Sequence, residues 1–330
     1  MIITQCLLLI ITLNKGVINM NIKKIGLTAL AASLVSVSAH AGAMSVAGGA
    51  SIGIKNNAGT EGGKSITMGN QLTFTGGGEL DNGLNVALSF VIDQGDGVTA
   101  GTAPFDSHSI TISSDAMGSI VIAGEGAGNA QSALDTTAAG DIWDNGFTYT
   151  AMAGSDASSS SINYTLPSMV DDLAVSASYS PSGTAVNSTT ALGLTYTGIE
   201  GLSVSYGVGE AGSTTATSAG DVTTIKGSYA IGSFTVAYSN TESDKDSTGT
   251  DEEMSSFKLS YTVSDDLSIS YGEEVHETSG QSVDEEFEQL SVSYTTGGMT
   301  LTASQTDASG LGNSAGTIGE RWKLGASFAF

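Results

Sequence analysis

The chain has 330 residues, with 10 Lys and Arg against 34 Asp and Glu, 44 glycines, 3 prolines and one cysteine. A net charge of −24 argues against nucleic acid as a partner, because phosphates are bound by cationic side chains. One cysteine excludes an internal disulfide framework, and after the N-terminal region no run of roughly 18 apolar residues predicts a spanning helix.

The N-terminal region has the pattern of a secretory signal peptide. In MNIKKIGLTALAASLVSVSAHA, residues 20–41, two lysines precede an apolar stretch, and AHA at 39–41 is a small-residue cleavage site. Basic, apolar and small residues in this order are typical of exported proteins. Residues 1–19 are apolar but too short to span a membrane, and we interpret Met20 as the true start.

We therefore predict a leader over 1–41 and a mature domain over 42–330. Cleavage removes the cysteine and three of the 10 cations, so 7 basic residues remain against 34 acidic ones. The mature domain then has no thiol chemistry.

Segments that alternate between apolar and polar residues recur along the mature domain. A period of two with β-branched and aromatic residues predicts β-strands, and the face opposite the apolar one carries Ser, Thr, Ala, Gly or Lys. The clearest segments are 84–90, 173–179, 192–196, 202–206, 234–238, 257–261, 267–271 and 290–294.

The connections between these segments alternate between short and long. The seven short turns are at 79–83, 115–118, 167–172, 198–201, 231–233, 264–266 and 297–298. The eight long loops are at 57–64, 95–107, 126–158, 181–188, 210–220, 242–252, 276–285 and 308–318. This count predicts an all-β, antiparallel transmembrane barrel of about 16 strands, with short periplasmic turns and long extracellular loops.

Tyrosine positions support hairpins over a repeat architecture. One set precedes short turns and the other precedes long loops, as expected for aromatic rings at the two membrane interfaces. The alternative is a secreted structural or adhesive β-protein such as a β-helix, in which the tyrosine would not change ends on alternate strands. The first set is Tyr164, Tyr196, Tyr229, Tyr261 and Tyr294, and the second is Tyr179, Tyr206, Tyr238 and Tyr271.

The segment RWKLGASFAF, residues 321–330, is predicted to close the barrel. An unpaired strand edge is not tolerated in a bilayer, so this strand is expected to pair with residues 44–56. Its apolar face includes the residues that we interpret as a closure and assembly signal: Trp322, Leu324, Phe328 and Phe330.

Together with the leader and the closing strand, SSSSINYTLPSMVDDLAVSASYSP (158–181) resembles the general porins of Gram-negative bacteria, particularly the alphaproteobacterial type. The resemblance implies a trimer in the outer membrane, placed there by the barrel-assembly machinery and surrounded by lipid and lipopolysaccharide. It also implies a passive channel for small hydrophilic solutes, with no enzymatic activity and no cofactor, and a third loop that constricts the pore. A substrate-specific channel is the alternative. Such porins usually place several arginines opposite that loop, whereas the mature domain has only Arg321.

The loop at 126–158 is expected to set ion preference, since rings of carboxylates favour cations and repel anions. Its acidic side chains, including one at its root, are Glu125, Asp135, Asp141, Asp144 and Asp156. Strand parity points an opposing set of cations into the lumen: Lys226, Lys258, Arg321 and Lys323, with Lys55 nearer a rim. The alternative is a solvated acidic face unrelated to permeation.

Other acidic clusters at 93–97, 242–253, 273–277 and 284–288 are interpreted as a solvated outer rim. Ca²⁺ binding by these oxygen-rich loops is the alternative, although none has EF-hand spacing. His276 and Ser279 fall in one predicted loop with nothing to fix a nucleophile–base geometry, so an enzyme is not predicted.

The first five strands lack the tyrosines of the later ones. We predict that their outward face packs against neighbouring subunits. The small or aliphatic outward positions are Val46, Ala50, Ile52, Ile110, Ile112, Ile120 and Ile122.

Overall fold

A computed structural model describes residues 44–56, 63–93, 105–126, 128–147, 152, 154–155, 160–182, 188–211, 220–246 and 250–330. The predicted signal peptide and its cleavage site lie outside these residues.

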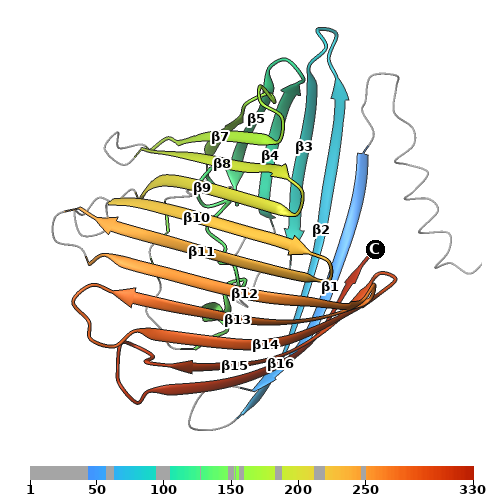
Figure 1. Cartoon of the computed structure of the whole chain (residues 1–330). Helices are drawn as coiled ribbons and strands as arrows, with labels where there is room; N and C mark the ends of the chain where they lie inside the picture. Colours follow the sequence, from blue (N-terminus) through green and yellow to red (C-terminus); the bar gives the residue numbers. More distant parts are fainter. Residues whose placement is uncertain are drawn as a thin grey trace, which may run out of the picture.

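Sixteen antiparallel strands form one closed barrel (Figure 1). The strand number, the pairing of β1 with β16 and the all-β class are as predicted from the sequence, and a β-helix is ruled out because the sheet is a closed antiparallel barrel. The strands are β1 Met44–Asn56, β2 Lys64–Glu79, β3 Asn85–Asp93, β4 Phe105–Ser114, β5 Gly118–Glu125, β6 Ser161–Thr165, β7 Leu173–Ser180, β8 Thr189–Ile199, β9 Leu202–Ala211, β10 Gly220–Ile231, β11 Phe234–Lys245, β12 Glu252–Ser264, β13 Leu267–Thr278, β14 Glu285–Thr296, β15 Met299–Ser309 and β16 Ile318–Ala329.

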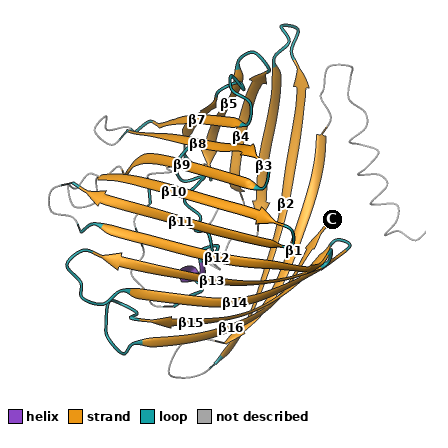
Figure 2. Cartoon of the chain, viewed as in Figure 1, coloured by secondary structure: helices purple, strands orange, loops and turns teal. Residues whose placement is uncertain are grey.

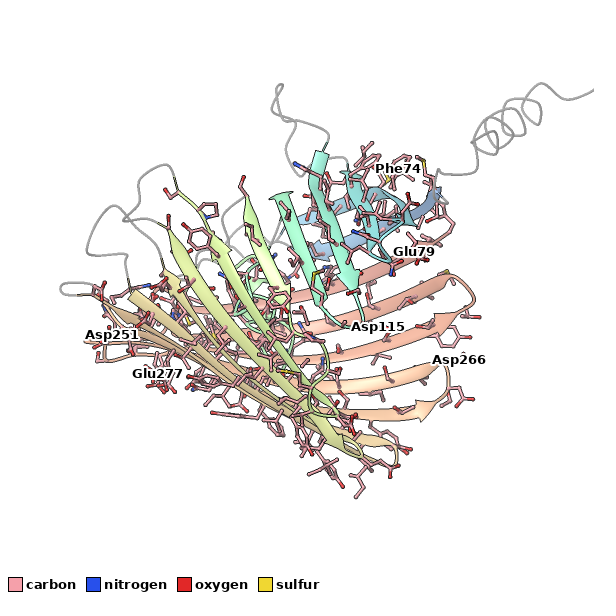
Figure 3. The ribbon with its side chains drawn as sticks, turned by 90° about the horizontal axis from the view of Figure 1, so that it is seen from above. Phe74, Glu79, Asp115, Asp251, Asp266 and Glu277 are labelled. Carbon is pink, nitrogen blue, oxygen red and sulfur yellow. The ribbon has the colours of Figure 1, made fainter. Side chains whose placement is uncertain are left out.

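The connections at the two barrel ends differ in length, as expected. Asp251 and Glu277 lie at the long-loop end, whereas Asp266 lies in a short turn at the opposite end (Figure 3). Among the described residues, no helix is both long enough and apolar enough to cross a membrane.

The polar and apolar faces are inverted relative to a water-soluble protein. Val236 of β11 pairs with Leu259 of β12, and both side chains are exposed on the outer surface. Ser239 and Ser256, a pair on the inner face of the same two strands, are almost fully buried. Apolar residues outside and small hydroxyl residues inside are what a barrel in hydrocarbon with a hydrated interior requires.

The tyrosines of both sets lie on the outward face, and those of two strands joined by a short turn are close together. Tyr229 of β10 pairs with Val236, and Tyr238 is the next outward residue along β11, about 7 Å further on. Beyond Tyr238 the outward positions become polar, ending at Glu242 and Asp244. In this hairpin the tyrosines therefore lie toward the long-loop edge of the apolar surface, which continues past Tyr229 to the short turn.

Candidate functional site: the loop inside the barrel

The third long connection leaves β5 and lies against the inner wall of the barrel. Its short 3₁₀ helix η1, Ile142–Asp144, contacts β13 and β14 (Figure 2, purple). Three backbone N–H groups of the loop donate to hydroxyl groups of wall serines: Ala130 to Ser178 at 2.9 Å, Ala138 to Ser239 at 2.8 Å, and Ala139 to Ser256 at 2.9 Å. The predicted inward folding of this loop is thus confirmed.

Glycines on the wall make room for the loop backbone. A Cβ at Gly272 of β13 would lie 2.8 Å from the Cβ of Ala139, closer than real carbon contacts allow. Further glycines at which an added Cβ would meet loop atoms are Gly193, Gly207, Gly209 and Gly319. The close approach of the loop therefore depends on missing side chains, as is common where two backbones pack closely.

Glu274 of β13 holds the middle of the loop. Its side chain is fully buried, accepts a hydrogen bond from the Thr137 hydroxyl, and accepts another from the Trp143 N–H at 2.8 Å. Hydrogen bonds to a carboxylate are stronger than those between neutral groups. Glu274 therefore fixes both the 137–141 turn and the start of η1.

A small apolar cluster holds the far end of the loop. Phe147 of the loop lies against Phe287 of β14, with ring centroids 6.1 Å apart. The cluster also contains Ala139, Ile142, Ala308 and Leu311. Apolar packing inside the lumen thus supplements the polar contacts along the wall.

The cations predicted to face the loop across the pore instead bind its backbone. Lys226 donates to the Thr136 carbonyl at 2.6 Å, and Lys258 is 3.4 Å from the Ala139 carbonyl. Arg321 donates to the Gly146 carbonyl at 2.8 Å and lies 5.4 Å from the centroid of the Phe147 ring. These three cations point inward as predicted, but they form part of the surface on which the loop rests and not a wall opposite it.

Asp135 and Asp141 lie together near Lys226. Burial raises the pKa of Asp135 to about 6, with a further contribution from the Asp141 charge. Asp141 has a left-handed backbone, with φ of 54°, and its carboxylate accepts the Thr137 N–H at 2.9 Å. The Asp141 N–H donates in turn to the Thr137 hydroxyl at 2.7 Å, so this turn is fixed by reciprocal bonds.

Lys55, Lys323 and Asp144 form a second group near Arg321. Lys55 and Lys323 are register partners on β1 and β16, and Lys55 interacts electrostatically with Arg321 and with Asp144. Asp144 is the last residue of η1 and is exposed. Glu125 is the last residue of β5, and Asp156 lies outside the described residues.

The 273–277 cluster is not a solvated loop. It belongs to β13, whose alternation places Glu273 and Glu277 on the outer face and Glu274 inside. His276 is likewise buried, with Nδ1 3.0 Å from a Glu285 carboxylate oxygen. Among the described residues, no group of three or more His, Cys, Asp or Glu is arranged to hold a metal ion.

Comparison with known proteins gives one family. A family model described as Gram-negative porin matches residues 26–286. A search of curated proteins found no match.

Several solved porin structures share the barrel. A porin refined at 1.8 Å has 16% identity and a TM-score of 0.65, covering 87% of this chain and 100% of its own. An anion-selective porin from Comamonas acidovorans has 16% identity and a TM-score of 0.66, with 87% and 99% covered. A loop-deletion mutant of OmpT, an outer membrane protein of Vibrio cholerae, has 18% identity and a TM-score of 0.64, with 88% and 99% covered. With the family match over most of the sequence and a closed sixteen-stranded barrel, this chain belongs to the Gram-negative porin family.

Proposed function

We propose that this outer-membrane porin is a passive, cation-preferring channel for small hydrophilic solutes. The ion preference is inferred from a difference between the basic and the acidic side chains of the loop region in what they contact. Lys226, Lys258 and Arg321 interact with loop carbonyls, whereas Asp141 and Asp144 are partly or fully accessible to solvent. Acidic side chains that line a pore favour the passage of cations.

The barrel itself does not determine the preference. The anion-selective porin from Comamonas acidovorans has a similar fold, so the sign of the permeating ion must depend on the side chains inside. The mature domain has 34 acidic residues against 7 basic ones, so its net charge also favours cations. Net charge of one sign raises the local concentration of counter-ions.

The test is planar-bilayer conductance of the purified protein under a KCl gradient. We expect open channels whose reversal potential has the sign for K⁺ over Cl⁻. The variant Asp141→Asn should reduce that potential, and the matched change Asp251→Asn, at the long-loop end, should have a smaller effect. A reversal potential that favours Cl⁻ would overturn the cation preference, and an absence of conductance would overturn the channel.

The proposal extends to assembly and surroundings. It includes export through the predicted signal peptide. A shell of lipid and lipopolysaccharide and a homotrimer formed through β1–β5 are consistent with the outer face. On that face Val46, Ile52 and Ile110 are exposed, and the Phe74 and Phe90 rings stack with centroids 4.7 Å apart. An exposed apolar surface of this kind must meet either lipid or another subunit.

A further inference from the structure

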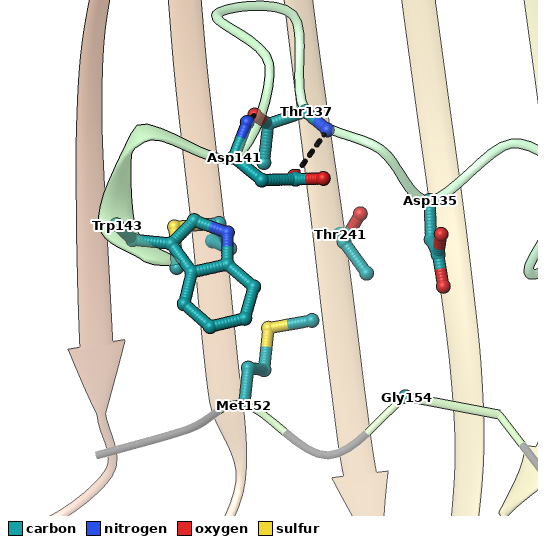
Figure 4. Close-up of a pocket in the computed structure, with 8 residues that line it drawn as sticks. Asp135, Thr137, Asp141, Trp143, Met152, Gly154 and Thr241 are labelled. Atoms are coloured by element: carbon teal, nitrogen blue, oxygen red, sulfur yellow. Dashed lines mark hydrogen bonds between the residues drawn. The ribbon is translucent and has the colours of Figure 1, made fainter. Parts of the chain in front are cut away.

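A cavity of about 200 Å³ lies between the inward-folded loop and the barrel wall (Figure 4). The loop contributes one side and β11 and β12 contribute the other. The residues that line it are Asp135, Thr137, Asp141, Trp143, Met152, Gly154, Thr241 and Met254.

The cavity lies on the side of the loop that faces the long connections. Thr241 pairs with Met254, and each is two residues nearer the long-loop end than Ser239 and Ser256, which receive the loop N–H groups. Both side chains are buried, so they form the floor of the cavity and not its rim. Met152 and Gly154, which belong to the same loop, border the cavity on the opposite side from Thr137 and Asp141 (Figure 4).

The lining combines an apolar surface with negative charge. The indole of Trp143 and the thioether of Met152 face the same space (Figure 4). Met254, which also lines the cavity, belongs to β12 of the wall. Asp135 and Asp141 add carboxylates to the same cavity. Lys226 interacts electrostatically with both acids, but its ammonium group donates to the Thr136 carbonyl rather than lining the cavity.

We propose that this cavity is a binding subsite for a small organic cation, namely a primary or quaternary amine with an aromatic or short alkyl body. The ammonium group is matched by the two carboxylates and by the face of an indole, which attracts cations. The apolar body is matched by the methionine side chains, which adapt to irregular shapes. This inference rests on the proposed channel function and specifies a class of solute that the channel holds during passage.

The size of the cavity restricts the ligand. Pockets that enclose drug-sized molecules have volumes of roughly 300–1,000 Å³, so this one accepts a smaller amine. Inorganic cations have no body to fill it and are expected to pass without retention. Anions of the same shape are excluded by the carboxylates.

The experiment measures block of K⁺ current through single channels by phenethylammonium added at the long-loop side. We expect a saturable, concentration-dependent decrease in current, and no comparable decrease with the neutral isostere 2-phenylethanol. Removing the indole with Trp143→Ala should raise the half-blocking concentration about tenfold, as loss of one cation–π contact in a partly desolvated site would. Trp143→Phe keeps an aromatic face and should retain most of the block.

A charge-matched comparison separates this subsite from general ion preference. Asp141→Asn, which alters the cavity, should weaken the block, whereas Asp144→Asn, a change on the same loop outside the cavity, should lower K⁺ preference but leave the block intact. Heat-modifiable mobility and the K⁺ conductance without amine verify that each variant is folded. A cation-preferring channel whose amine block is absent, or is unchanged in Trp143→Ala, overturns the subsite while the proposed function stands. A protein that forms no channel overturns both.

Discussion

Phe330 and Gly48 exchange two backbone hydrogen bonds, of 2.7 and 2.9 Å, and the Phe330 ring occupies the place where a side chain on Gly48 would lie. These bonds extend the β1–β16 ladder past its last register pair, Gly49 with Ala329. At the end of the closing strand pair, the aromatic ring of Phe330 thus packs against the backbone of Gly48.

Gly48→Ala should lower the temperature at which the barrel loses its heat-modifiable mobility, because the new methyl group must displace the Phe330 ring. Because the Phe330 ring is exposed and can rotate away, the cost should lie at or below the lower end of the range of about 1–3 kcal/mol for overpacking in a core. Gly49→Ala is the matched control, since its Cβ would meet only the Phe328 carbonyl oxygen at 3.7 Å. In a Phe330→Ala background the cost of Gly48→Ala should largely disappear, and a cost that persists there would show that the ring is not the cause.

Glu274→Ala should loosen the inner loop and raise single-channel conductance. The change removes two hydrogen bonds to a buried carboxylate, each worth about 1.5–3 kcal/mol. Current recordings and liposome swelling with sugars of increasing size measure the effect. Glu277→Ala, on the outer face of the same strand, should leave both readouts unchanged; equal effects from the two changes would contradict the role given to Glu274.

Cation preference should decrease as the pH falls from 8 to 5. The pKa of Asp135 is raised to about 6, so this carboxylate is charged above that pH and becomes neutral below it. Its contribution to K⁺ selectivity is therefore present at pH 8 and lost at pH 5. Reversal potentials across this range check the prediction, and Asp135→Asn should flatten the step near pH 6. An unchanged step in that variant would assign the titration to another group.

Ala50→Trp should dissociate the proposed trimer, because a large ring on the outward face of β1 prevents close approach of a second subunit. Unheated gel electrophoresis reports the oligomer. Val204→Trp places the same ring on the outward face of β9, which we assign to lipid, and should leave the oligomer intact. A trimer that survives Ala50→Trp would move the interface away from β1–β5.

The sequence predicts which face of each strand a residue occupies better than it predicts where strands end. Ser239 and Ser256 are on the lumen face, as the period-two pattern indicates. The sequence predicts Glu274 within the outer acidic cluster 273–277, because the regular polar–apolar alternation ends near Tyr271. β13 nevertheless continues to Thr278. Past the apolar band both faces of a strand are polar, so the strand has no hydropathy signal there.

The sequence pattern does not predict the contacts of the inner loop, for a related reason. Parity correctly points Lys226, Lys258 and Arg321 inward, but it gives no information about their height relative to the loop. That height depends on the stagger between strands, which a barrel fixes only when it closes. The glycine at 272 likewise appears in the sequence as one of 44, and only the approach of Ala139 gives it a role.

The attachment of Gly146 to Arg321 has a consequence for biogenesis. The loop follows β5 in the chain, yet the anchor of Gly146 lies on β16. This end of the loop can therefore dock only when the C-terminal strand is in place, whereas its contacts with β7, β11 and β12 do not involve β16. The lumen accordingly reaches its final width only once the first and last strands have joined.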